Sequence, residues 1–116
     1  MARETWSCGV AFHIDQTSTW NLLLANVKNL LDGWEGPVDV EVVANGPAVE
    51  GLVRESGEGL TIERLTQRGV RFLACNNSLR AHSIAREDLI PQIEVVASGV
   101  VHLAALQLDG WAYLKP

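Results

Sequence analysis

The chain has 116 residues, of which 47% are hydrophobic and 20% are charged, and its formal net charge is −5. That length suits one domain with a core large enough to fold without disulfide bridges, so we expect a single domain over residues 1–116. The nine basic residues are scattered, which argues against a nucleic-acid partner. No apolar run could span a bilayer and the first residues lack the pattern of a signal peptide, so we expect a cytoplasmic protein without a membrane partner.

The first half of the chain contains two strand-like segments with a helix-like segment between them. Residues 8–14 form an apolar run too short for a helix, which predicts a buried strand. Over residues 20–31 the apolar side chains recur every three or four positions, which predicts an amphipathic helix. Residues 38–44 alternate valine with acidic residues, so we expect a second strand there.

The second half continues the alternation of strands and helices. Residues 49–54 predict a short helix and residues 61–68 a longer one, and the two form one interrupted crossover. Residues 70–75 predict a third strand, and the next helix is expected to begin near Leu79. Residues 93–97 and 111–114 predict the fourth and fifth strands, with a helix over residues 100–108 between them.

This alternation predicts the fold class. Strands joined through helices form right-handed crossovers, which place helices on both faces of a parallel sheet. We therefore expect an α/β fold, namely a three-layer α/β/α domain with a mainly parallel five-stranded sheet. The order of the strands in the sheet does not follow from the sequence.

In a parallel sheet, the loops that follow the carboxyl ends of the strands meet along one edge, where functional sites are usually found. The residues expected at this edge are mostly small or polar. They are His13 and Asp15 after the first strand, Asn45 and Gly46 after the second, Cys75, Asn76, Asn77 and Ser78 after the third, and Ser98 after the fourth. This group is the candidate site.

Cys75 is the most informative of these residues because it lies where a strand meets the start of a helix. The free N–H groups and the positive dipole end of a helix N-terminus lower the pKa of a thiol, which makes the sulfur more nucleophilic. Alternatively, Cys75 is an inert small residue that completes a buried strand, a common role for cysteine. Its position alone does not distinguish these two interpretations.

The other chemistry-bearing residues give weaker patterns. His13 could orient or deprotonate a group near Cys75, although a histidine at a strand end is more often structural. Cys8 begins its strand, and parallel strands would place it about 16 Å from Cys75, too far for a disulfide. We expect no metal site and no cofactor, because ligand-spaced clusters and glycine-rich nucleotide motifs are absent from the sequence.

The helix predicted over residues 100–108 is apolar around nearly its whole circumference, with His102 among apolar neighbours. In a domain of this size, one side of a covering helix normally faces water. A partner subunit is the simplest cover for the second apolar side, so we expect a homo-oligomer.

Five segments carry a resemblance to a known family. They are VAFHID, VEVVANGPAV, GVRFLACNNSL, SGVVHL and GWAYLKP, and they extend over nearly the full length of the chain. With these segments the chain resembles the DsrE/DsrF-like family. The resemblance implies a small α/β/α domain that assembles into trimers or hexamers, with a cysteine after the third strand that passes sulfur as a persulfide. Cys75 matches that cysteine.

Two functions follow from these observations. The first is an intracellular sulfur carrier or sulfurtransferase-like protein with a persulfide on Cys75, held by N–H groups near Asn76, Asn77 and Ser78. No second cysteine is expected near the site, so the sulfur donor or acceptor would be another protein. The second is a non-catalytic oligomeric protein that binds a small ligand in a strand-end pocket. Thiol reactivity distinguishes the two.

Overall fold

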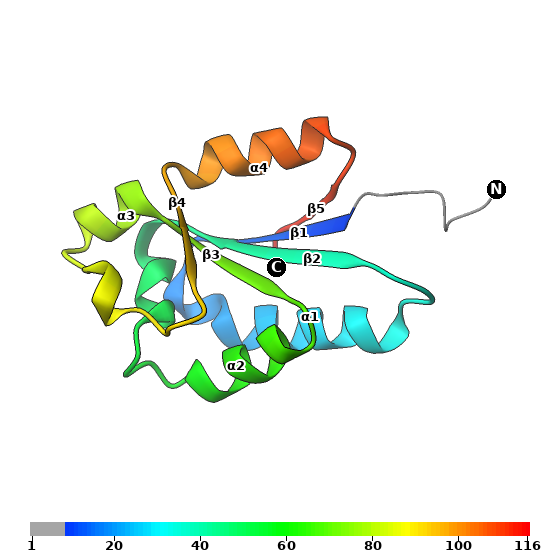
Figure 1. Ribbon diagram of the computed structural model, residues 1–116, viewed down its shortest axis with the longest axis horizontal. Helices are drawn as coiled ribbons and strands as arrows, with labels where there is room; N and C mark the ends of the chain where they lie inside the picture. The colour runs from blue at the N-terminus through cyan, green and yellow to red at the C-terminus, as the bar shows by residue number, and fades with distance from the viewer. Residues whose placement is uncertain (1–8) are drawn as a thin grey trace.

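The computed structural model describes residues 9–116, which form a five-stranded sheet with helices on both faces (Figure 1). The strands are β1 (Gly9–Ile14), β2 (Asp39–Ala44), β3 (Arg71–Cys75), β4 (Glu94–Val96) and β5 (Ala112–Leu114). The α-helices are α1 (Trp20–Gly33), α2 (Gly59–Gln67), α3 (Asn76–Ala81) and α4 (Gly99–Leu108). Short 3-10 helices are η2 (Thr17–Thr19), η3 (Gly46–Leu52) and η4 (Arg86–Asp88).

The strands lie in the order β4-β3-β2-β1-β5, and each neighbouring pair is parallel. The register pairs His13 with Val43, Ala44 with Ala74, and Cys75 with Val96. The carboxyl ends of all five strands therefore meet along one edge. The expected α/β fold with a mainly parallel five-stranded sheet is confirmed, and the structure supplies the strand order that the sequence left open.

The two faces of the sheet carry different helices. In Figure 1, α1 and α2 lie below the sheet and α4 alone lies above it. The central strands β1, β2 and β3 are buried on both faces, which explains their nearly continuous apolar sequences. The large core lies on the side of α1 and α2 and is built on side chains such as Phe12, Trp20, Ile62 and Phe72. The cluster under α4 is small and consists of Ala11, Val43, Leu73, Leu103 and Leu106.

Two helices differ from the sequence-based expectation. The helix expected over residues 49–54 is the 3-10 helix η3, which begins at Gly46 and has proline in its first turn. Its Gly51 lies directly against the indole of Trp20, where any Cβ would overlap the ring. The Trp20 Nε1–H donates to the Ala48 carbonyl at 3.0 Å, so packing on the indole fixes this segment. The helix expected near Leu79 begins at Asn76, directly after Cys75.

The structure also bears on membrane insertion. No helix within residues 9–116 combines the length and the apolar composition that crossing a bilayer requires.

Candidate functional site

Residues from β1, β2 and β3 converge at the carboxyl edge of the sheet, on the face that α4 covers. Side chains alternate between the faces along a strand, and Ala11, Val43 and Leu73 belong to the cluster under α4. The residues two positions further along these strands are His13, Asn45 and Cys75, which therefore share the α4 face. Cys75 and Asn45 follow the paired residues Ala74 and Ala44, so they are neighbours across β3 and β2.

Cys75 ends β3, as the sequence predicts, and is the N-cap residue of α3, which begins earlier than expected. It is a free thiol, and only 5% of the residue is exposed. The first residue of α4, Gly99, lies against it: a Cβ built on Gly99 would be 3.2 Å from the Cys75 Cβ and 3.5 Å from the Asn45 Cβ. Glycine thus lets the start of α4 approach the thiol closely.

The surroundings of Cys75 favour a thiolate. Burial raises the pKa of the thiol, but hydrogen bonds from the Gly99 N–H, the Ser78 hydroxyl and the N–H groups of Ser78 and Asn77 outweigh this effect. The net result is a pKa below the ordinary thiol value. These donors come from the starts of both α3 and α4, so two chain segments act on one sulfur atom.

The Ser78 hydroxyl is itself held in place by the start of η3. The Gly46 N–H donates to Ser78 Oγ at 2.7 Å, which leaves the hydroxyl proton to point at the Cys75 sulfur. Gly46 has a φ of +57°, a backbone conformation that side-chain-bearing residues rarely adopt. Of the predicted site residues, Gly46 therefore orients the Ser78 hydroxyl, and Ser78 in turn donates to the Cys75 sulfur.

His13 lies in a hydrogen-bonded chain beside this group. Its Nε2 is 2.8 Å from Asn45 Oδ1, and its Nδ1 is 2.6 Å from the hydroxyl of Tyr113 on β5. An amide oxygen only accepts hydrogen bonds, so Nε2 carries the proton and Nδ1 accepts from Tyr113 in neutral His13. These two hydrogen bonds fix the tautomer of His13 and occupy the side-chain oxygen of Asn45.

The other predicted residues take smaller roles. The Asn77 side chain accepts a hydrogen bond from Arg80 at 3.0 Å, so only its backbone N–H serves Cys75. Ser98 is the N-cap of α4 but makes no side-chain capping bond. Asn76 opens α3 and is half-buried. Cys8, and with it the expectation that it does not bridge to Cys75, lies outside the described residues.

Sequence reasoning missed two contributors, Gly99 and Tyr113. The Ser-Gly pair at the start of the last helix was a signal for Gly99, because glycine at a helix start permits a close approach. Tyr113 reaches His13 because β5 pairs with β1, and nothing in the sequence gives that strand order.

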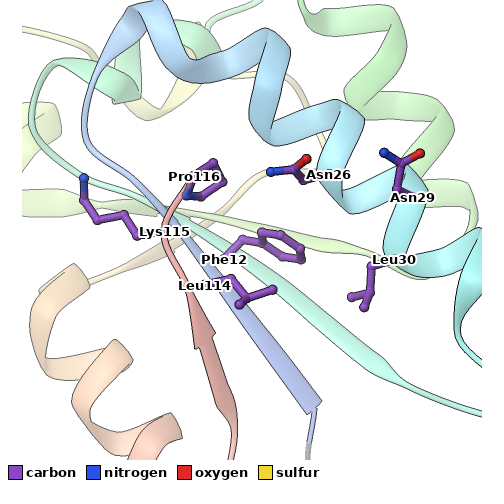
Figure 2. Close-up of a pocket in the computed structure, with 7 residues that line it drawn as sticks. All are labelled: Phe12, Asn26, Asn29, Leu30, Leu114, Lys115 and Pro116. Carbon is purple, nitrogen blue, oxygen red and sulfur yellow. The ribbon is translucent and has the colours of Figure 1, made fainter.

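Two hollows of the described surface lie away from this site. A groove of about 430 Å³ runs between α1 and the edge strand β5, on the opposite face of the sheet (Figure 2). Asn26 and Asn29 line it from α1, with Phe12 and Leu114 beneath them. Another, of about 480 Å³, lies between α1 and α2. Neither is lined by a predicted site residue, so neither is the strand-end pocket that a ligand-binding protein would use.

The chain is similar to several solved structures. A protein of unknown function from Methanobacterium thermoautotrophicum, MTH1491, is 43% identical, with a TM-score of 0.89 over 95% of this chain and 100% of that one. The ychN protein from E. coli is 18% identical, with a TM-score of 0.77 over 94% and 99% of the two chains. BT1422 from Bacteroides thetaiotaomicron is 17% identical, with a TM-score of 0.74 over 93% and 94%. The last two similarities concern the fold alone.

A comparison with functionally curated proteins finds none that matches. The family model of the DsrE/DsrF-like family, in contrast, matches residues 9–116, which include every described strand and helix. Together with the 43% identity to MTH1491, this match establishes that the chain belongs to the DsrE/DsrF-like family.

Proposed function

We propose that this protein is a sulfur carrier or sulfurtransferase-like protein that holds sulfur as a persulfide on Cys75. The observation that carries the proposal is the set of four hydrogen-bond donors from Gly99, Ser78 and Asn77 around one buried thiol. Four donors stabilise a negative charge on the sulfur, whereas a cysteine that only fills space in a core needs no hydrogen-bond donors. Family membership adds support, because the resemblance implies sulfur transfer on the cysteine that Cys75 matches.

The proposed step moves one sulfur atom without a net redox change. The Cys75 thiolate attacks the outer sulfur of a donor persulfide, R–S–SH, and a bond forms between this sulfur and the Cys75 Sγ. The bond between the two donor sulfurs breaks, and its electron pair leaves with R–S⁻, which takes a proton from water. Cys75 then carries –S–SH, and a lower thiol pKa favours the attacking form.

Asn45 supports the outer sulfur in this proposal. His13 occupies its Oδ1, so its amide NH₂ group is left to donate elsewhere, and no described residue accepts from it. Asn45 neighbours Cys75 across the sheet and borders Gly99. An anionic persulfide on Cys75 would supply a hydrogen-bond acceptor for this NH₂ group.

We propose further that the protein is a homo-oligomer, a trimer or hexamer as the resemblance implies. The outer side of α4 supports this, because Val101 is 66% exposed and Leu108 is 89% exposed. Val101→Asp should therefore lower the mass measured by light scattering, whereas Leu103 lies in the core of its own subunit and is unsuited to this test. A monomer mass for the wild type at tens of micromolar protein would overturn this part of the proposal.

Intact-mass measurement after exposure to a persulfide donor tests the sulfur step. The wild type should gain the mass of one sulfur atom per subunit, and a reductant should remove it. Cys75→Ser should abolish the gain with the fold intact, and Cys8→Ser should leave it unchanged. If the wild type takes up no sulfur under conditions that load a known carrier, the proposal fails and the non-catalytic ligand-binding function becomes the better one.

A further inference from the structure

A second polar cluster lies on the α4 face, at the end of the sheet opposite to Cys75. Glu41 on β2 accepts hydrogen bonds from Arg71 on β3 at 2.9 Å and from His102 on α4 at 2.7 Å. The other carboxylate oxygens of the cluster belong to Glu94 on β4, which binds Arg71 through two contacts at 2.8 and 2.7 Å. Four elements are thus joined through one chain of hydrogen-bonded side chains.

Glu41 is held rigidly in this cluster. Glu41 is the buried charged residue of the described part of the chain, with 4% of its surface exposed. Leaving its carboxylate unpaired would therefore cost folding free energy. Arg71 is fixed by both Glu41 and Glu94, and these contacts raise the pKa of its guanidinium and keep it charged. The Glu41 carboxylate is therefore a fixed point on the sheet to which α4 can attach.

The apolar attachment of α4 is weak in comparison. Only Leu103 and Leu106 from this helix enter the small cluster against Ala11, Val43 and Leu73. Apolar contact is non-directional, so it resists a small slide of the helix less than a hydrogen bond to a carboxylate does. Within the described residues, the contact between His102 and Glu41 is the side-chain hydrogen bond that joins α4 to the sheet, beside the backbone pairing of β4 and β5 at either end of the helix.

His102 lies about one helical turn from Gly99, the residue that donates to the Cys75 sulfur. The space at Gly99 is tight, since a Cβ there would already be 3.2 Å from the Cys75 Cβ. A helix shift of about 1 Å would weaken the bond between the Gly99 N–H and Sγ, because N–H hydrogen bonds weaken steeply with distance and angle.

We propose that His102 is a positioning residue: by binding Glu41, it holds α4 where the Gly99 N–H meets the Cys75 sulfur. Thiol reactivity at one end of the sheet thus depends on a charged cluster at the other. The inference rests on the proposed function only in that Cys75 is the reactive group, because the thiol can be titrated without any sulfur transfer.

The test uses the full chain carrying the substitution Cys8→Ser, so that Cys75 is the one thiol that titrates. His102 is then replaced in this background. Glutamine places its amide nitrogen close to where the imidazole Nε2 binds Glu41, whereas asparagine does not reach so far. His102→Asn and His102→Ala should raise the thiol pKa by about one unit and slow alkylation about three- to tenfold at neutral pH. His102→Gln should restore most of the wild-type value.

Melting temperature and sulfur loading are measured beside the thiol titration. Gln107→Ala, on the exposed side of α4, is the matched control and should leave the thiol pKa unchanged. The inference is overturned if folded His102→Asn keeps the wild-type thiol pKa, or if His102→Gln and His102→Asn shift it equally. If the wild type loads no sulfur yet the His102 variants shift the pKa as expected, the proposed function fails and this inference stands.

Discussion

The two faces of the sheet differ in what holds their helices in place. Under α1 and α2 a large apolar core fixes both helices through many side chains, among them Phe12, Trp20 and Phe72. Under α4 the apolar cluster is small, and polar groups stand at both of its ends: Cys75 with its donors at one end and Glu41 with its partners at the other. We infer that the first face provides most of the stability, while the second face holds the candidate site.

The largest expected effect separates the two faces by stability. Leu23 on α1 and Leu103 on α4 are both buried leucines, so the same substitution can be made in each face. Leu23→Ala should cost about 3–5 kcal/mol, and Leu103→Ala about 2–3 kcal/mol, because the smaller cluster near solvent can collapse around the cavity. Urea denaturation gives both values. A larger loss for Leu103→Ala would contradict the division of roles.

The next effect concerns reactivity on the α4 face. Ser78→Ala removes one donor from the Cys75 sulfur and leaves the Gly46 N–H without its acceptor. The thiol pKa should rise by about one unit, as expected for losing a hydrogen bond to a charged group. Ser98→Ala is the matched control, because that hydroxyl makes no capping bond. The thiol pKa of each variant is measured by titrating the ultraviolet absorbance of the thiolate. The same pKa in both variants would disprove the role of Ser78.

Stability as a function of pH should show the same donors at work. The pKa of Cys75 is lower in the folded state than in the unfolded chain, so its stabilising contribution is fully present above the unfolded value, about 8.5. This contribution disappears as the pH falls through the folded pKa. The unfolding free energy of the wild type should therefore rise with pH relative to Cys75→Ser across that window. A constant difference would show that the pKa is not lowered.

The smallest effect lies at the sheet edge. Tyr113→Phe removes the hydroxyl that donates to His13 Nδ1, in a partly exposed contact, and should cost about 0.5–1 kcal/mol. The bond from His13 to Asn45 should persist, so the thiol pKa should not move. Nitrogen chemical shifts of the His13 ring report its tautomer. A changed tautomer or a shifted thiol pKa in Tyr113→Phe would contradict this expectation.

The periodic parts of the sequence were sufficient to predict the fold. Amphipathic spacing located α1, an alternating valine-rich run located β2 and a short apolar run located β3, because these patterns reflect burial on one or two faces. The 3-10 form of η3 and its start at Gly46 escaped prediction, because the conformation depends on packing of Gly51 against Trp20, a contact between residues far apart in the chain.

The candidate site was predictable only in part. Local placement at strand ends identified Cys75, Asn45 and Ser78, since parallel strands bring their carboxyl ends together. The contributions of Gly99, Tyr113 and His102 depend on strand order and on where α4 sits over the sheet. Tertiary packing sets both, and no local pattern encodes them.

The position of Gly99 in the chain has a consequence for folding. Three of the four donors to Cys75 come from α3, the segment that directly follows it, whereas the fourth comes from α4. A folding intermediate in which β1, β2 and β3 have paired but α4 has not yet docked therefore has a thiol with fewer donors. An undocked α4 would also uncover the buried thiol, so the lost donor and the gained access act on its reactivity in opposite directions. The combination of a full set of donors and a shielded sulfur therefore exists only once α4 has packed.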